Sequence, residues 1–218
     1  MPVTIIRKAP KNLKLSAGAH PEGSKAMCVM ELSAYLVNGW TDHPACVSPV
    51  IAQFCRSWND GMNDTDRQRL LPYAVKVLGT ATTKADEETR AWLACDWLIR
   101  VQTPAWLRLA GLEKEAQALG ALARISDATL ARAAQPALDD ARQKAAAAWA
   151  AAREDGARDG ARDAARVAAW DAARVAAGKS LRPTVELLQG SAFQLLDAMI
   201  EVGRDEVVTK IPRARKPV

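Results

Sequence analysis

The amino-acid sequence predicts an all-α protein: a multi-helix bundle or a short helical stack, with a long alanine-rich helix packed against it. Three observations support this prediction. An alanine-rich tract spans residues 141–178, helix start and stop signals recur from residue 24 onward, and the turns between these signals are short. No repeat with a period of about 30–45 residues is visible, which argues against an ordinary solenoid.

The alanine-rich tract is the most regular part of the chain. From Ala148 onward it repeats every four residues, so small residues, aspartates and arginines each form rows of their own. Alanine has the best helix propensity, and Asp–Arg pairs three residues apart stabilise a helix. A four-residue period overshoots the 3.6-residue turn, so the small row drifts by about 40° per repeat. We therefore expect several packing partners along it, with Gly156 and Gly160 as close-approach points or as a break.

The first part of the chain is punctuated by proline and glycine. Residues 1–23 are expected to be irregular for this reason, although a short strand at Val3–Arg7 is an alternative. Ser24 is predicted to cap the first helix. Because Pro44 disfavours helix in the residue before it, residues 40–47 are predicted to form a loop.

Capping signals then set the next helices. A serine–proline pair starts a helix over residues 48–61. Asn63, Asp64 and Thr65 open the next one, with Thr65 and Gln68 at capping-box spacing, and it is predicted to run to Gly79 with a kink at Pro72.

The second half of the chain continues in the same way. Thr83 starts a helix that is apolar nearly all round after Arg90, a pattern typical of a helix buried in the middle of a bundle. Shorter helices are predicted over residues 105–112, 113–122 and 129–134, before the alanine-rich helix. Ser180 and Pro183 are predicted to open a last helix that ends at Gly203.

Composition divides the chain into four segments. These are an irregular basic segment (1–23), a Trp-rich helical bundle (24–135), the alanine-rich helix with a C-terminal helix packed on the same body (136–203), and a basic tail (204–218).

Two compositional features predict the compartment. No apolar run approaches the roughly 20 residues of a membrane span, and the N-terminus lacks the apolar core and cleavage site of a signal peptide. We therefore expect a cytoplasmic protein, without membrane contact, whose four cysteines are reduced. The common nucleotide-binding and hydrolase motifs are missing from the sequence, so no cofactor is expected.

Positive charge gathers at the two ends. The net charge is +5, with +4 on residues 1–25 and +4 on residues 209–218, which leaves −3 on the rest. This distribution predicts solvated tails or auxiliary electrostatic contacts, and contact with nucleic acid is the alternative function that these tails allow. The basic residues concerned are Arg7, Lys8, Lys11, Lys14, Lys210, Arg213, Arg215 and Lys216.

One histidine lies near three cysteines. His43 and Cys46 have metal-ligand spacing, and Cys28 and Cys55 on flanking helices could complete a Cys3His zinc site. Zinc sites usually show two such close pairs, so buried core cysteines are the simpler interpretation. A thiol nucleophile, Cys28 or Cys46, with His43 as base and Asp42 as its orienting group, is an alternative. Residues adjacent in sequence seldom point at each other usefully, which counts against that arrangement.

Two polar loops interrupt the apolar helices and are the predicted binding surface. They contribute Trp40, Asp42 and His43 from one loop, and Asp60 and Asp64 from the turn at residues 60–66. Trp40 could equally be a lid on the core. The turn lacks the spacing of a calcium loop and its final glutamate, so helix capping accounts for it better.

Three stretches carry a resemblance: MCVMELSAYL, TDHPACVSPVIAQFCRSWND and AWLACDWLIRVQTPAWLRLAGL. They resemble a family of uncharacterised proteins from actinobacteria and their phages. The tract AAAAWAAAREDGARDGARDAARVAAWDAARVAA is similar to one in proteins labelled immunity proteins. This resemblance implies an antagonist or protective binding partner in bacterial or phage conflict, and it brings no catalytic residues with it.

We therefore expect a non-enzymatic helical protein that binds another protein, encoded by a phage or mobile element. A nucleic-acid-associated protein that uses the basic ends is the first alternative, and a zinc- or thiol-dependent site is the second. A second copy of the chain is a further candidate partner, because the row of small residues could pack against its twin.

Overall fold

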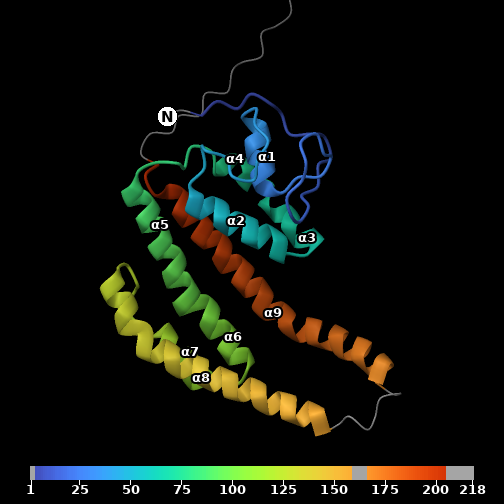
Figure 1. Ribbon diagram of the computed structural model, residues 1–218, viewed down its shortest axis with the longest axis vertical. Helices are drawn as coiled ribbons and strands as arrows, with labels where there is room; N and C mark the ends of the chain where they lie inside the picture. The colour runs from blue at the N-terminus through green and yellow to red at the C-terminus, as the bar shows by residue number, and fades with distance from the viewer. Residues whose placement is uncertain (1–2, 159–165, 205–218) are drawn as a thin grey trace, which may run out of the picture. The chain divides into compact units, whose positions relative to one another are not determined.

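The structure is a computed structural model that describes residues 3–158 and 166–204, with side chains described for residues 3–148 and 181–204 (Figure 1). The all-α prediction is confirmed: every named element in the described residues is a helix, and they contain no strand. In order, the elements are α1 (Val29–Leu36), α2 (Pro49–Gly61), α3 (Asp64–Arg67), the 3₁₀ turn η1 (Gln68–Leu70), α4 (Tyr73–Lys76), α5 (Lys84–Trp97), the π turn η2 (Leu98–Gln102), α6 (Thr103–Leu109), α7 (Glu113–Gly120), α8 (Ala128–Arg158) and α9 (Arg166–Glu201).

The chain forms two compact units. Unit 1 comprises Met1–Ala91 and Leu196–Val218, and unit 2 comprises Trp92–Leu195. The boundaries fall inside α5 and α9, whereas the four segments predicted from composition divide the chain elsewhere. Each unit is therefore described by itself.

In unit 1, the first helix begins at an unusual cap. The Cys28 thiol accepts a hydrogen bond from the Glu31 backbone N–H (3.4 Å), and the Glu31 carboxylate accepts one from the Cys28 N–H (2.8 Å). This reciprocal pair is a capping box. The prediction that Ser24 caps this helix is wrong, because the Ser24 hydroxyl closes a local turn with the Ala26 N–H instead (3.1 Å).

The basic N-terminal segment is tied to unit 1 through its backbone. The N–H groups of Ile6 and Arg7 both donate to the Leu36 carbonyl at the end of α1 (2.8 and 3.1 Å). The alternative of a strand at Val3–Arg7 is therefore wrong, because these residues satisfy a helix terminus and pair with no strand.

Between α2 and α5 the chain is more broken than predicted. Ser48 caps α2 as expected, and α2 ends at Gly61. The helix predicted to run to Gly79 is instead split into α3, η1 and α4. Asn63 is the cap of α3, accepting from the Asp66 N–H (2.9 Å), whereas the Gln68 side chain bonds the distant Leu15 backbone. That long-range contact and Pro72, which lacks an N–H donor, account for the break.

Helix α5 is not buried in the middle of a bundle. Its second half carries Trp92, Cys95 and Trp97, all only partly buried. Arg90 is the fully buried residue of α5. The predicted central position is thus wrong, because an apolar helix surface is left partly uncovered in unit 2.

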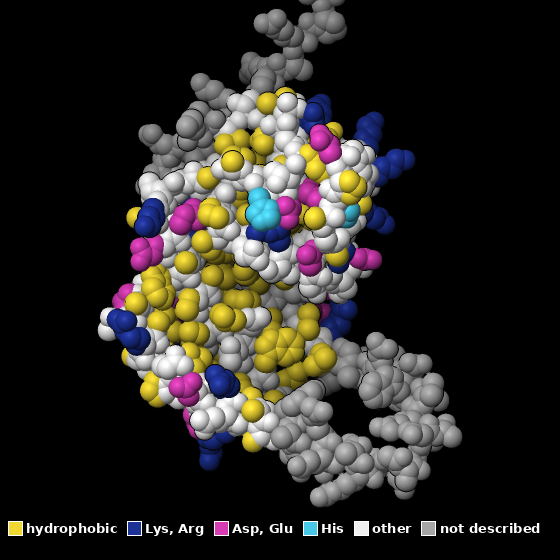
Figure 2. Space-filling view, in the orientation of Figure 1, with side chains coloured by type: hydrophobic (Ala, Val, Ile, Leu, Met, Phe, Trp, Pro, Cys, Tyr) yellow, Lys and Arg dark blue, Asp and Glu magenta, His cyan; other side chains and the backbone are white. Residues whose placement is uncertain are grey.

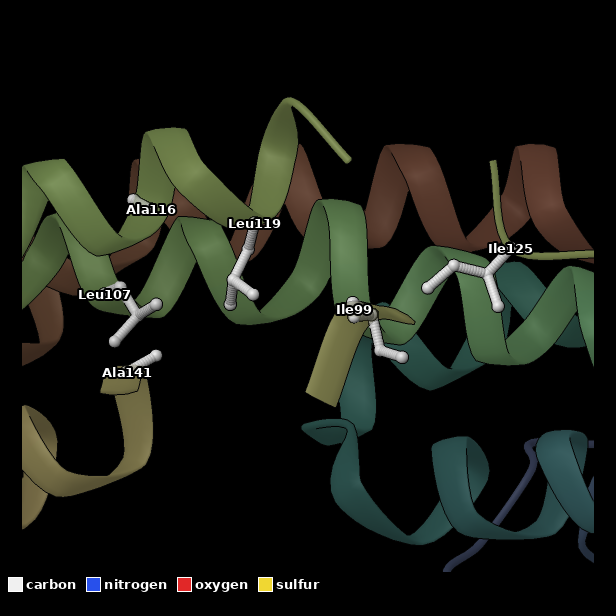
Figure 3. Close-up of a cluster of buried hydrophobic side chains, with 7 residues drawn as sticks. Ile99, Leu107, Ala116, Leu119, Ile125 and Ala141 are labelled. Atoms are coloured by element: carbon white, nitrogen blue, oxygen red, sulfur yellow. The ribbon is translucent and has the colours of Figure 1, made fainter. Parts of the chain in front are cut away.

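The core of unit 2 joins α6, α7 and α8 (Figure 3). Its buried members are Ile99, Leu107, Ala116, Leu119, Ile125, Ala134 and Ala141. Ala134 and Ala141 belong to the first half of α8, so this part of the helix packs closely against the core, as the small size of alanine allows.

The bounds of α8 and α9 differ from the prediction, because the alanine-rich tract at residues 141–178 is divided between these two helices and Gly178 lies inside α9. The separate short helix at 129–134 is wrong, because α8 runs unbroken through it, through Pro136 and through Gly156. The start predicted at residues 180–183 is also wrong, since α9 begins at Arg166 and includes Pro183. Gly160 and the basic residues Lys210, Arg213, Arg215 and Lys216 lie outside the described residues.

Candidate functional site

Residues from the two segments predicted as a binding surface meet at one cavity in unit 1. Asp42 from the first loop and Asp60, which the structure places in the last turn of α2 and not in a loop, both line this cavity of about 280 Å³, with Arg56 between them in sequence. The remaining lining residues are Gly18, Ala19, Cys28, Gln53 and Ser57. Asp64 lies apart, at a second cavity of about 650 Å³ beside Lys14, Ser16 and Gln68.

The charges at the first cavity hold its walls together. Arg56 Nη1 donates to the Asp42 carbonyl (2.8 Å), and Arg56 Nη2 donates to Gln53 Oε1 (2.6 Å). Asp60 Oδ1 accepts from the Gly18 N–H (2.7 Å) and from Asn59 Nδ2 (3.0 Å). These hydrogen bonds hold the loop at Asp42 and the segment at Gly18 against α2.

His43 and Trp40 differ in how far they are exposed. His43 Nδ1 lies 2.6 Å from Asp42 Oδ1, so the expectation that these neighbours do not meet is wrong, and the His43 side chain is 67% exposed. Trp40 is partly buried, with its indole N–H donating to the His20 carbonyl (2.9 Å) and its ring edge-on to Tyr35. This is the geometry expected of a lid on the core.

The cysteines do not gather around His43. Cys28 and Cys55 are buried, and burial raises the pKa of each thiol to about 12. Burial also raises the pKa of Cys46. Among the residues that the structure describes, no group of three or more His, Cys, Asp or Glu side chains is placed to hold a metal ion. Neither the Cys3His set nor an ionised thiol nucleophile is therefore assembled there.

A buried carboxylate that the sequence did not reveal organises this region. Glu31 is 2% exposed, and its carboxylate accepts from the His20 N–H (2.5 Å) as well as from Cys28. His20 Nδ1 lies 2.8 Å from Glu31 Oε2. The only sequence signal was a glutamate three residues after the cap position, and cysteine is not a usual cap. Glu31 thus fixes the loop that supports Trp40.

Most of the exposed large apolar side chains in the described residues lie in unit 2, whereas Ile6 (65%) and Val75 lie in unit 1. Leu98 is 50% exposed, Trp106 41% and Leu109 40%, and all three lie on the continuous stretch formed by α5, η2 and α6. Figure 2 shows hydrophobic side chains gathered over these elements. Contiguous exposed apolar surface of this kind marks interaction sites more often than isolated exposed residues do.

The π turn η2 explains how core and surface residues stay separated on this helix. A π turn inserts one extra residue into the helix. Two residues that are eight positions apart across the turn therefore point in the direction that a spacing of seven, about two full turns, gives in a regular α-helix. Leu98 and Trp106 therefore share the exposed side, while Ile99 and Leu107 share the core side. The Thr103 hydroxyl donates to the Leu98 carbonyl (2.8 Å) and stabilises the turn.

Helix α9 adds a fourth exposed apolar residue. Trp97 Nε1 donates to Ser191 Oγ (3.0 Å), which links α5 to α9 within unit 2. Leu187, 61% exposed, lies one turn before Ser191 on the same side of α9. We refer to Leu98, Trp106, Leu109 and Leu187 as the Trp106 face.

Two ion pairs lie next to the Trp106 face in sequence. Arg108 Nε lies 3.5 Å from Glu113 Oε1, and Arg182 Nε lies 2.7 Å from Glu186 Oε1. In each of these two pairs the positive charge is matched by a carboxylate within the chain.

No family model, no curated protein and no solved structure matches this chain. The resemblance to the actinobacterial and phage family is therefore neither supported nor contradicted. In the described part of the chain, no helix is both long and apolar enough to cross a membrane.

Proposed function

We propose that the protein binds another protein through the Trp106 face. The observation that carries this proposal is the alignment of Leu98, Trp106 and Leu109 on the exposed side of one unbroken helix. Interface centres are enriched in aromatic side chains and depleted in charge, and tryptophan is prominent among the residues that dominate binding energy. A π turn is also frequently found at functional sites.

The partner fitted to this face is an amphipathic helix. A helix-in-groove contact uses apolar anchors spaced over several turns, and the Trp106 face offers such anchors on α6 and α9. Since Arg108–Glu113 and Arg182–Glu186 are already paired, we expect a partner helix whose flanks are not strongly charged.

The resemblance noted in the sequence supplies the class of partner. Proteins labelled immunity proteins bind and neutralise an antagonist, so we propose that the partner is a protein effector of bacterial or phage conflict. No catalytic group is required for such a role, since inhibition by binding rests on the affinity of the interface alone.

Matched bait variants test the proposal. Full-length protein, Trp106→Ala and Val75→Ala are used to capture partners from host and phage-infected lysates, because Val75 is a similarly exposed apolar residue in unit 1 (44%). A protein that the wild-type chain and Val75→Ala retain, but Trp106→Ala does not, is then purified. Its affinity for each of the three baits is measured by calorimetry. Loss of a hot-spot tryptophan costs at least about 2 kcal/mol, or about 30-fold in affinity.

Two results would count against the proposal. If Trp106→Ala and Val75→Ala retain the same proteins with equal affinity, the Trp106 face is not the interface. If sedimentation shows a dimer of the wild-type chain that Trp106→Ala abolishes, the face is occupied by a second copy and no heterologous partner is needed.

A further inference from the structure

The N-terminal segment of unit 1 is a fixed part of the folded body, contrary to the solvated tail that its charge predicted. The Ser16 N–H donates to the Met27 carbonyl (2.9 Å), and an isolated bridge joins Leu15 to Met27. Gln68 holds the Leu15 backbone from both sides, donating to its carbonyl (3.1 Å) and accepting from its N–H (2.8 Å). The Gly18 N–H is held by Asp60.

This segment displays unpaired positive charge. Lys8, Lys11, Lys14 and Lys25 are all exposed, and none of them forms an ion pair with the residues that the structure describes. Figure 2 shows Lys and Arg side chains spread along the edge of unit 1 where Figure 1 places this segment. The Leu15–Met27 bridge keeps Lys14 and Lys25 on neighbouring stretches of chain.

The acidic residues nearest to this segment do not cancel its charge. Glu22 is the one acid between residues 3 and 28. Asp64 is paired with Arg67 Nη1 (2.5 Å). Asp60 keeps its charge, since its donors are neutral backbone and amide groups, but Glu22 and Asp60 are outnumbered by the five basic residues of the segment. The segment therefore keeps an excess of positive charge at neutral pH.

An aromatic pair adjoins the basic residues. The Arg7 guanidinium lies 5.0 Å from the centre of the Tyr35 ring, and Tyr35 meets Trp40 edge-on with ring centres 6.5 Å apart. Both aromatic residues are partly exposed. A basic track beside partly exposed rings is the combination that binds single-stranded nucleic acid, through phosphate contacts and base stacking.

We propose that the basic strip formed by Arg7, Lys8, Lys11, Lys14 and Lys25, together with Tyr35, binds single-stranded nucleic acid. The lysines contact successive phosphates, and a base stacks on the Tyr35 ring in place of the Arg7 guanidinium that lies over it. This surface lies in unit 1 and does not depend on the Trp106 face of unit 2.

Two charge-matched variants of the full chain test the strip. The first changes Lys8, Lys11, Lys14 and Lys25 to glutamine, and the control changes Lys114, Arg124, Arg132 and Arg142, which are exposed basic residues of unit 2. Both variants lower the formal net charge from +5 to +1. Binding of a labelled oligothymidylate is followed by fluorescence anisotropy over a series of salt concentrations.

We expect the strip variant to change the salt dependence and the control to leave it nearly unchanged. For a single strand, the slope of log K against log salt concentration becomes shallower by about 0.7 for each phosphate contact that is removed. Removing four contacts should therefore reduce the magnitude of the slope by about 3. Equal losses of slope in both variants would overturn the proposal, because they would show that net charge alone drives binding. Absence of binding by the wild-type chain at low salt would also overturn it.

A second comparison separates nucleic acid from other polyanions. Tyr35→Phe keeps the ring and should bind oligothymidylate as the wild type does, whereas Tyr35→Leu should bind about 5-fold or more weakly, as loss of one stacked base predicts. Neither variant should change binding of an abasic phosphodiester strand of the same length. If the abasic strand binds as tightly as oligothymidylate, or if Tyr35→Leu is without effect, the strip is a general anion surface and the proposal fails.

Discussion

Arg90 offers the sharpest test of how unit 1 is held together. Its side chain is fully buried, and it donates from Nε to the Met199 carbonyl (3.0 Å) and from Nη2 to the Val202 carbonyl (2.6 Å). These carbonyls lie at the C-terminal end of α9, where no helical N–H remains to satisfy them. Arg90 Nη1 also pairs with Glu87 Oε1 (2.5 Å), whose other carboxylate oxygen accepts from the Ser48 hydroxyl.

Replacing Arg90 by methionine keeps most of the volume and removes all of these donors. Loss of one partner from a buried ion pair costs about 3–5 kcal/mol. Because the Glu87 side chain is 20% exposed, we take the lower end of that range and expect a loss of about 3 kcal/mol in the free energy of unfolding. That is a large share of the roughly 5–15 kcal/mol that stabilises a typical domain.

Urea unfolding followed by tryptophan fluorescence measures this loss, with Arg204→Met as the control. Arg204 pairs with Glu201 (2.6 Å) at the surface, so its replacement should cost less than about 1 kcal/mol. Adding Glu87→Gln to Arg90→Met should recover part of the loss, because the stranded carboxylate is removed, with a coupling of about 0.5–3 kcal/mol. A loss below about 1 kcal/mol for Arg90→Met would refute the buried network as a source of stability.

Three further predictions concern stability and titration. The Cys28 and Cys55 thiols have a pKa near 9 in the unfolded chain and about 12 in the folded one, so the free energy of unfolding should fall as the pH rises from 9 toward 12. Alkylation of these thiols in the native protein at pH 8 should be slow in a mass-spectrometric time course. Lys144 lowers the pKa of Glu115, and Glu115 raises the pKa of Lys144. The α7–α8 contact should therefore weaken as the pH falls below the ordinary range of a carboxyl pKa and Glu115 becomes protonated. In a thermal melt, Glu115→Gln should remove that part of the acid sensitivity. Gly203→Ala should destabilise unit 1 by at least about 1 kcal/mol in urea unfolding, because φ is +69° and the new Cβ would lie 2.6 Å from Asp86 Oδ2; an unchanged midpoint would contradict this geometry.

Local capping chemistry made much of the fold predictable. The start of α2 at Ser48 and Pro49 and its end at Gly61 follow from residues that act on their own neighbours, and the structure has both. The cap at Cys28 was missed because it depends on Glu31, whose carboxylate is also held by His20. The break after α3 depends on a Gln68–Leu15 contact between residues 53 positions apart, which no local pattern records.

The candidate sites were only partly predictable. Sequence reasoning placed Asp42 and Asp60 on polar loops, and both line one cavity, but their bonds to Gly18 and Arg56 could not be foreseen. A helix that is apolar nearly all round gives no sequence signal for which of its sides other helices will cover. The exposure of Leu98 and Trp106 is therefore visible only in the structure. The π turn that aligns these two residues leaves no recognisable sequence signal.

Hydrogen–deuterium exchange on the full chain, with and without a captured partner, tests the central claim most directly. If the Trp106 face is the binding surface, the partner slows exchange at the amides of residues 98–109 on η2 and α6 and around Leu187 on α9, while the loop at residues 40–44 is unchanged. Slowed exchange at residues 40–66 with no change on η2 and α6 would contradict the assignment of the Trp106 face as the binding surface.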